Sequence, residues 1–234
     1  MSTKLKKLAA LEALSLIEEP ITLGIGSGST VNAFIDQLKE KKTLIDGVVA
    51  ASTESEKRLK NNGFSVIDLN TTSSLDLYID GADEIDSQLA MIKGGGGALT
   101  REKILAANAR EFVCIVDESK IVSRLGAFPV AVEVIPMARS FVGRELLKLG
   151  GSPEYRHGYK TDNGNIILDV HELDLSEPYK LEQTINNIPG VIENGIFSQY
   201  RAKKCLVAYK SEGIKTLVPS LSAWRVFVSL AQAF

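Results

Sequence analysis

The chain has 234 residues, of which 44% are hydrophobic and 24% are charged, and its formal net charge is −2. These proportions are typical of a globular protein and exclude a disordered chain, a collagen-like rod and a coiled coil. The charge balance also argues against a nucleic-acid partner, because nucleic-acid-binding surfaces need an excess of Lys and Arg.

The N-terminal residues Met1–Ala10 contain charges but no apolar core of a signal peptide, and they are typical of the first turns of an amphipathic helix. No apolar run reaches the length of a membrane span. Cys114 and Cys205 lie in apolar runs and are too few for a disulfide framework, so we expect buried, reduced thiols. These features predict a cytoplasmic protein without a membrane partner.

The first half of the chain alternates short apolar runs with helical patterns. The apolar runs are Ile21–Ile25, Val48–Ala51, Phe64–Leu69, Leu75–Ile79 and Phe112–Val116. The helical patterns are Thr30–Glu40, Glu54–Asn61 and Leu99–Ala109. This alternation predicts a Rossmann-like α/β domain, in which a parallel sheet has helices on both faces. Ligands of such sheets bind in the loops that follow the carboxyl ends of the strands.

After about Phe128 the order of the predicted elements changes. Strand-like runs occur at Val130–Ile135, Glu154–Gly158, Ile166–His171 and Val191–Phe197, and helical patterns at Ala138–Leu149 and Tyr179–Asn187. The resulting β-α-β-β-α-β order predicts a small α+β, ferredoxin-like domain. A hairpin of Cys205–Tyr209 and Ile214–Leu217 is expected to return to the first sheet. We therefore predict a Rossmann-like catalytic domain of residues 1–128 and 204–234 and a ferredoxin-like domain of residues 129–203.

The tail Ser220–Phe234 would be apolar around nearly its whole circumference if it were helical. Because it is too short to span a bilayer, we interpret it as a segment that docks on the chain's own surface or on a partner.

The first loop, Gly24–Thr30, reads Gly-Ile-Gly-Ser-Gly-Ser-Thr and leads from a predicted strand into a helix. Its glycines allow close approach of a ligand, and the N–H groups at a helix start bind phosphate. The dinucleotide pattern fails at its last glycine, and the Walker A pattern lacks its Gly-Lys. A mononucleotide or sugar-phosphate site remains, against the alternative of a tight turn with a capped helix.

The acidic loop, Asp80–Asp86, places four carboxylates at the end of a predicted strand. Like charges held close together raise one another's pKa, which suits proton transfer near neutral pH. The carboxylates could also bind sugar hydroxyls. A divalent cation site and a solvated acidic loop are the alternatives.

The glycine loop, Gly94–Gly97, lies between Lys93 and a helical pattern that contains Glu102. A flexible linker would be richer in Ser, so we interpret the loop as a binding loop with Lys93 at its mouth. Glu102 would lie in the first turn of the helix, where the helix dipole favours its ionised form, and is a candidate base. A carboxylate that merely stabilises the helix start is the alternative. A base and a lysine could together form and stabilise an enediolate.

These motifs together resemble type A ribose-5-phosphate isomerase. The resemblance rests on Gly24–Thr30, Asp80–Asp83, Lys93–Gly96 with Arg101–Lys103, Asp117–Lys120 and Thr161–Asp169, in order along the chain. It implies the interconversion of ribose 5-phosphate and ribulose 5-phosphate in the pentose phosphate pathway, without a metal or other cofactor. It also implies a homo-oligomer, either a dimer or a tetramer.

By position, the resemblance implies that Glu102 is the base that moves a proton between C1 and C2, and that Lys93 stabilises the enediolate. Asp80 would assist opening of the furanose ring, and Asp83 would bind sugar hydroxyls. The implied substrate-binding residues are Ser27, Gly28, Ser29, Thr30, Asp80, Gly81, Ala82, Asp83, Lys93, Gly94, Gly95, Gly96, Lys120 and Lys6.

Two other functions are weighed against this one. A sugar-phosphate sensor would keep the first loop but would not need Glu102 and Lys93 together. A metal-dependent sugar-phosphate enzyme would use the carboxylates of the acidic loop as ligands.

Overall fold

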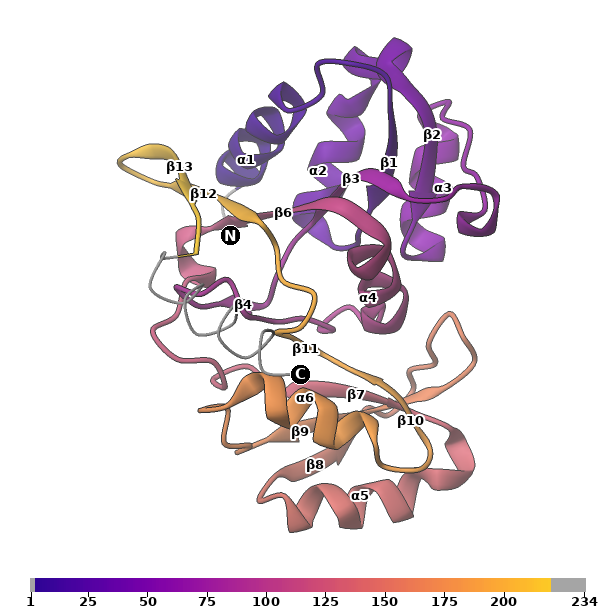
Figure 1. The fold of residues 1–234 in the computed structure, drawn as a ribbon, viewed down its shortest axis with the longest axis vertical. Coiled ribbons are helices and arrows are strands. Elements are labelled where there is room, and N and C mark those ends of the chain that lie inside the picture. The colour runs from indigo at the N-terminus through magenta and orange to yellow at the C-terminus, as the bar shows by residue number, and fades with distance from the viewer. Residues whose placement is uncertain (1–2, 220–234) are drawn as a thin grey trace, which may run out of the picture.

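A computed structural model of the chain describes residues 3–219, and a six-stranded sheet dominates it (Figure 1). The strand order is β13-β12-β6-β3-β1-β2, and all strands are parallel except β13, which pairs antiparallel with β12. The strands are β1 (Ile21–Ile25), β2 (Ile45–Ala50), β3 (Leu75–Asp80), β6 (Ala109–Asp117), β12 (Lys204–Tyr209) and β13 (Gly213–Leu217). The predicted parallel sheet and the returning hairpin are confirmed.

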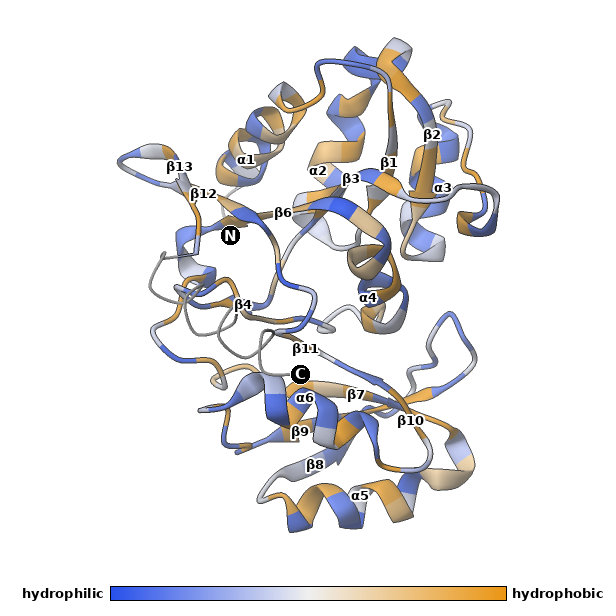
Figure 2. Ribbon diagram, viewed as in Figure 1, coloured by the Kyte–Doolittle hydropathy of each residue, from blue (hydrophilic) through white to orange (hydrophobic). Residues whose placement is uncertain are grey.

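Both faces of this sheet are covered, because its strands carry buried apolar residues on both sides. Figure 2 shows hydrophobic residues along these strands. Along β6, Val113 and Ile115 belong to one core, while Phe112, Cys114 and Val116 belong to the other. The first core packs under α1 (Thr3–Ser15), α2 (Ser29–Leu38) and α3 (Thr53–Asn61). The second packs under α4 (Leu99–Asn108) and a small sheet of β4 (Glu84–Ile85), β5 (Met91–Ile92) and β11 (Ile196–Phe197). Both cysteines are buried and free, as predicted.

A second sheet lies beyond α4, at the bottom of Figure 1, and is wholly antiparallel. Its order is β10-β7-β9-β8, from β7 (Val130–Val134), β8 (Ser152–Tyr155), β9 (Ile166–His171) and β10 (Val191–Asn194). Helices α5 (Arg139–Lys148) and α6 (Pro178–Asn186) complete the predicted β-α-β-β-α-β order. Between residues 3 and 219, the 3₁₀-helices are η1 (Lys39–Leu44), η2 (Leu69–Thr71), η3 (Glu118–Lys120) and η4 (Pro136–Ala138).

Helix α4 lies between the two large sheets and contacts both. Leu105 and Ala106 pack on the six-stranded sheet, whereas Leu99 packs against Ala131 and Ile167 of the antiparallel sheet. The start of this helix is therefore held by residues from both parts of the chain.

Two predicted strands are wrong in part. Phe64–Leu69 is not a strand of the sheet and forms a single parallel bridge, between Val66 and Val48 of β2, where Ile67 N donates to Val48 O at 2.8 Å. The run Val191–Phe197 is two strands in different sheets, β10 and β11, which are separated by Gly195. The predicted domain boundaries stay a prediction.

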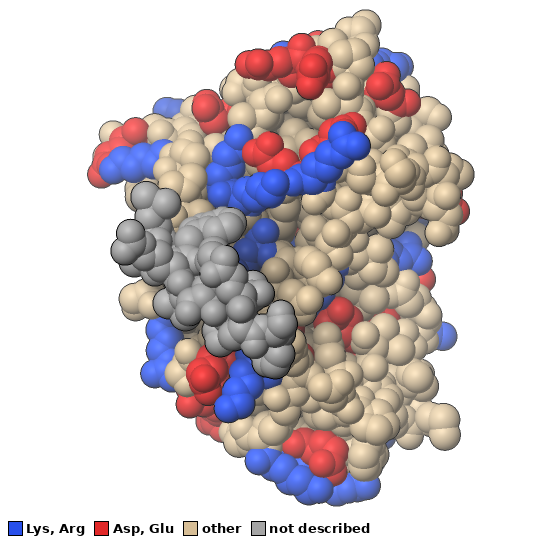
Figure 3. Space-filling model, viewed as in Figure 1, with Lys and Arg blue, Asp and Glu red and all other residues tan. Residues whose placement is uncertain are grey.

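Positive and negative side chains are interspersed on the face shown in Figure 3, which accords with the small net charge. Among residues 3–219, no helix is both long enough and apolar enough to cross a membrane. The predicted docking tail, Ser220–Phe234, lies outside the described residues.

Candidate active site

The first loop and the acidic loop meet at the carboxyl edge of the six-stranded sheet. They follow the parallel neighbours β1 and β3, and the backbone N–H of Gly26 donates to Ile79 O at 2.9 Å. A side chain at Gly26 has no room, because its Cβ would lie 1.9 Å from Cγ of Asp80. The first loop therefore closes directly over the Asp80 carboxylate.

Asp80 is fully buried, and its carboxylate is surrounded by four donors. Oδ1 accepts from the backbone N–H groups of Ser27, at 3.1 Å, and Gly81, at 2.7 Å. Oδ2 accepts from the Tyr78 hydroxyl and lies 2.8 Å from Nζ of Lys93. Burial and the nearby Asp80 charge raise the pKa of Tyr78 well above its ordinary value, so this hydroxyl stays a donor.

The sequence predicts that Lys93 stands at the mouth of the glycine loop. In the structure Lys93 directly precedes this loop, and its side chain is buried. Its Nζ donates to Gly81 O at 2.6 Å and lies 2.8 Å from Asp80 Oδ2 and 3.3 Å from Glu102 Oε2. Burial by itself would lower the pKa of Lys93, but the charges of Asp80 and Glu102 outweigh it and raise the pKa. The side chain is therefore a fixed cation.

Glu102 lies in the first turn of α4 and is only 3% exposed. Ser27 Oγ donates to its Oε1 at 2.6 Å. Burial, followed by the charge of Asp80, raises the pKa of Glu102 from 4.5 to about 7, against the opposing effects of Lys93 and the Ser27 hydrogen bond. Burial and the Asp80 charge therefore outweigh the groups that favour the ionised form, and the predicted effect of the helix dipole stays a prediction. A carboxyl with this pKa can both take up and release a proton at neutral pH.

The other end of the first loop is built to receive an anion. Gly28, with φ of 90°, precedes α2 and has no side chain to cap it. The N–H groups in the first turn of a helix lack partners within the helix and carry a partial positive charge, so they attract phosphate. The turn starts with Ser29 and Thr30, and Nζ of Lys6 on α1 donates to Ser29 Oγ at 2.6 Å. The predicted residues of this loop are thus brought together with a cation.

The glycine loop forms a tight turn against the first loop. Its ends, Gly94 and Gly97, have φ of 105° and 78°, and Gly97 N donates to Gly94 O at 2.9 Å. A Cβ placed on Gly96 would lie 3.7 Å from Ser27 Oγ. The turn requires the positive φ values that glycine adopts readily, which explains the repeated glycines better than linker flexibility does.

Asp83 is the carboxylate of the acidic loop that lies next to the glycine loop. It is half-buried, and its Oδ2 accepts from Gly95 N at 2.8 Å. Gly81 and Ala82, also half-buried, precede it at the same sheet edge. Lys120 is half-buried in η3, directly after β6, which is the neighbour of β3. The structure therefore places the remaining predicted residues at this edge as well.

The carboxylates of the acidic loop do not converge on one point. Glu84 accepts from the backbone N–H groups of Gly126, at 2.7 Å, and Phe128, at 2.6 Å. The pKa of Asp86 is raised by its burial and not by neighbouring carboxylates, contrary to expectation. Within the described part of the chain, no group of three His, Cys, Asp or Glu side chains could hold a metal ion. The geometry thus disfavours the alternative of a metal site in this loop.

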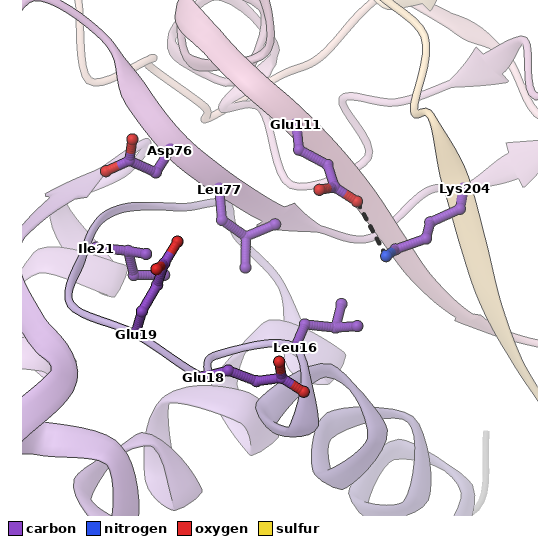
Figure 4. A pocket seen from close by; sticks show the side chains of 8 residues that line it. All are labelled: Leu16, Glu18, Glu19, Ile21, Asp76, Leu77, Glu111 and Lys204. Carbon is purple, nitrogen blue, oxygen red and sulfur yellow. Dashed lines mark ion pairs between the residues drawn. The ribbon is translucent and has the colours of Figure 1, made fainter.

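A cavity of about 570 Å³ opens at the opposite, amino edge of the sheet (Figure 4). Its walls are Leu16, Glu18, Glu19, Ile21, Asp76, Leu77, Glu111 and Lys204. The only cation among them, Lys204, is paired with Glu111 at 3.0 Å. Because the excess charge is negative, this cavity does not suit a phosphorylated ligand.

Two residues that support Lys93 escaped the sequence analysis. Gly195 O accepts from Lys93 N at 2.8 Å, and a Cβ on Gly195 would lie 2.1 Å from Lys93 O. The ring centroid of Phe197 lies 5.4 Å from Lys93 Nζ. A glycine inside a strand-like run indicates close backbone approach, and this signal could have revealed the position.

Comparison with known proteins agrees with this geometry. A family model described as ribose 5-phosphate isomerase A (phosphoriboisomerase A) matches residues 47–212. The ribose-5-phosphate isomerase A of Legionella pneumophila strain Corby is 57% identical over 92% of this chain and 99% of its own length.

Solved structures match over nearly the whole chain. The crystal structure of ribose 5-phosphate isomerase A from Neisseria gonorrhoeae has a TM-score of 0.90 and 47% identity, covering 93% of this chain and 97% of that one. The enzyme from Methanocaldococcus jannaschii has a TM-score of 0.87 and 40% identity, covering 92% and 98%.

Proposed function

The chain belongs to the ribose 5-phosphate isomerase A family, which interconverts ribose 5-phosphate and ribulose 5-phosphate in the pentose phosphate pathway, and on this premise we propose that Glu102 and Lys93 catalyse the reaction. The observation that carries the proposal is the buried contact between them. Oε2 of Glu102 lies 3.3 Å from Nζ of Lys93, beneath the first loop.

In the direction from aldose to ketose, ionised Glu102 removes the proton from C2 of the open-chain sugar. The electron pair of that bond forms the C1–C2 double bond, and the carbonyl oxygen at C1 gains negative charge. Glu102 then returns the proton to C1 while the hydroxyl proton on the C2 oxygen passes to the negatively charged C1 oxygen, so that C1 carries a hydroxyl group and the C2 oxygen becomes the new carbonyl. A pKa of about 7 suits both steps, because the same carboxyl is base and then acid.

Lys93 stabilises the enediolate as its charge develops. Its contacts with Gly81 O and Asp80 are 2.6 and 2.8 Å, whereas its contact with Glu102 is longer, at 3.3 Å. Once Glu102 is protonated, it no longer attracts the Lys93 ammonium as an anion does. The N–H of Lys93 that faces Glu102 can then turn to the enediolate oxygen. A preplaced cation acts strongly in a buried site, where water does not screen it.

Asp80 and Asp83 have different surroundings, which supports different roles. Asp83 is half-buried beside the glycine loop, and we assign it the contact with the sugar hydroxyls. Asp80 is fully buried and has four donors, so it fixes Lys93 and, after burial itself, contributes most to raising the pKa of Glu102. The resemblance implies that Asp80 assists opening of the furanose ring. To do so, its carboxylate must give up the contact with one of these four donors and contact the sugar instead.

The phosphate of the substrate is assigned to the first loop. Gly28, Ser29 and Thr30 supply N–H and hydroxyl donors, and Lys6 supplies the charge. Ser27 joins this loop to the base, because its N–H donates to Asp80 and its hydroxyl to Glu102. Lys120 approaches the substrate from the end of β6. We also propose that the enzyme works without a metal, as a homo-oligomer, in the cytoplasm, where its two free cysteines stay reduced.

Replacing Glu102 with Gln tests the proposal, because the amide keeps the shape and removes the base. We expect kcat to fall by about 10²–10⁴. Exchange of the C1 hydrogen of ribulose 5-phosphate with deuterated water should fall in parallel. Glu177→Gln, on an exposed residue outside the site, is the matched control. A folded Glu102→Gln variant with nearly normal turnover would overturn the assignment.

A further inference from the structure

Three consecutive carbonyl groups of the glycine loop are bound by side chains from the antiparallel sheet. Nη1 of Arg156, which follows β8, donates to Gly94 O at 3.1 Å and to Gly95 O at 3.3 Å. The hydroxyl of Tyr159 donates to Gly96 O at 2.9 Å. The loop that carries the predicted substrate contacts therefore has its carbonyl side fixed from outside the catalytic sheet.

The two side chains form one unit. Nε of Arg156 donates to Asp169 Oδ2 at 2.7 Å, and its Nη2 donates to the other oxygen of the same carboxylate. This two-point contact fixes the plane of the guanidinium and leaves Nη1 for the loop. The same guanidinium stacks 5.4 Å from the ring centroid of Tyr159. The ring in turn fills the space beside Gly97, where a Cβ would lie 2.1 Å from the Tyr159 hydroxyl.

The orientation of the carbonyls determines where the N–H groups point, because the two groups of one peptide plane are opposed. The N–H that shares a plane with Gly94 O is that of Gly95, and it donates to Asp83. The N–H that shares a plane with Gly95 O is that of Gly96, and it points away from Arg156 because Gly95 O points to Arg156. Both N–H groups therefore lie on the side of the glycine loop opposite Arg156, the side on which Asp83 lies.

We propose that Arg156 and Tyr159 are positioning residues, which hold the glycine loop so that it orients Asp83 and offers an N–H to the sugar. The proposal rests on the function proposed above, but it concerns a different part of the chain. The side-chain hydrogen bonds of Arg156 and Tyr159 go to Asp169 and to the carbonyl groups of the glycine loop, and not to Glu102, Lys93 or the first loop, which is assigned to the phosphate. Their effect should thus appear in binding of the sugar portion.

This reasoning separates positioning from a merely structural role. If Arg156 served only to join β8 to β9, its loss would lower the melting temperature and leave the folded enzyme with a normal KM. If it positions the loop, KM for ribose 5-phosphate rises with little change in kcat. This result is expected when an interaction is lost that binds the substrate and the transition state equally well. The inhibition constant of inorganic phosphate stays constant, because the first loop is unaffected.

The test uses Arg156→Lys, which keeps the charge but loses the fork, and Tyr159→Phe, which removes one hydroxyl. Arg124→Lys, in an exposed ion pair with Asp174, and Tyr200→Phe, on a half-exposed tyrosine, are the matched controls. For each protein, kcat and KM for ribose 5-phosphate, the inhibition constant of inorganic phosphate and the melting temperature are measured.

We expect KM to rise about tenfold or more for Arg156→Lys and about fivefold for Tyr159→Phe, with normal values for both controls. If Arg156→Lys does not fold, Tyr159→Phe decides alone. KM within twofold of the wild type in the folded variants, or an equal rise in the inhibition constant of phosphate, would overturn the proposal. Normal turnover by Glu102→Gln would instead overturn the proposed function, so the two failures are distinguishable.

Discussion

The hydrogen bond from Ser27 to Glu102 gives a sharp test of how the site controls its base. Ser27 Oγ lies 2.6 Å from Glu102 Oε1 and favours the ionised carboxylate, which lowers the pKa. Replacing Ser27 with Ala removes this donor and leaves burial and the Asp80 charge less opposed. The pKa of Glu102 should therefore rise above its value of about 7.

The size of the change follows from the geometry. A hydrogen bond to a charged group contributes about 1.5 kcal/mol or more, and 1.36 kcal/mol corresponds to one pKa unit. We therefore expect a rise of about one unit. Because the base acts only when it is ionised, kcat/KM increases as the pH rises through this pKa. The acidic limb of the profile should move from about pH 7 to about pH 8.

The assay is kcat/KM for ribose 5-phosphate between about pH 5.5 and 9.5. Ser27→Ala should lose about fivefold at pH 7 and nearly recover at the alkaline end. Ser29→Ala is the matched control, because this serine bonds Lys6 and not Glu102, and it should raise KM without moving the limb. The second ionisation of the substrate phosphate affects all three proteins equally. An unmoved limb, or an equal loss at every pH, would refute the reasoning.

Two further predictions concern charge elsewhere in the chain. Lys103 is buried, and its Nζ lies 2.8 Å from Glu182 and 2.9 Å from Glu193. Lys103→Met should therefore lower the free energy of unfolding, measured in urea, by about 3–5 kcal/mol, because it leaves two carboxylates without their cation. A loss below about 1 kcal/mol would contradict this prediction. Turnover should survive exhaustive chelation, because the carboxylates of the acidic loop bind separate backbone groups; activity lost to chelator and restored by Mg²⁺ would refute this.

The parts of the fold that could be predicted are those in which local pattern and tertiary contact agree. Ile166–His171 has the same bounds in the sequence prediction and in the structure, because its apolar residues pack directly in the core of the antiparallel sheet. The first loop and the acidic loop were placed correctly because the parallel strands that precede them, β1 and β3, end at one edge of the sheet. The glycine loop instead follows β5 of the small antiparallel sheet, and tertiary contacts bring it to the same edge. By contrast, Val191–Phe197 has apolar residues at both ends of Glu-Asn-Gly, and Gly195, which lies close to Lys93, separates it into strands of two sheets.

The ionisation of the site could not be predicted from local sequence. A carboxylate at a helix start is ordinarily favoured as the anion, and nothing near Glu102 in the sequence opposes this. The opposing effects come from burial and from Asp80, which stands 22 positions earlier in the chain, at the end of β3. Arg156 escaped notice for a similar reason, since its partners in the glycine loop are 61 and 62 positions away.

The charges of the site explain why one buried carboxyl can serve as base and acid. Before proton transfer, Lys93 carries one positive charge, while Asp80 and Glu102 each carry one negative charge. When Glu102 takes the proton, its negative charge moves to the enediolate, and the total charge in the buried site stays the same. Isolated charges are costly in a low-dielectric interior, so a step that only relocates a charge beside a fixed cation avoids most of that cost. Asp80 is therefore needed as a permanent anion, because it keeps Lys93 charged and in place while the other negative charge moves.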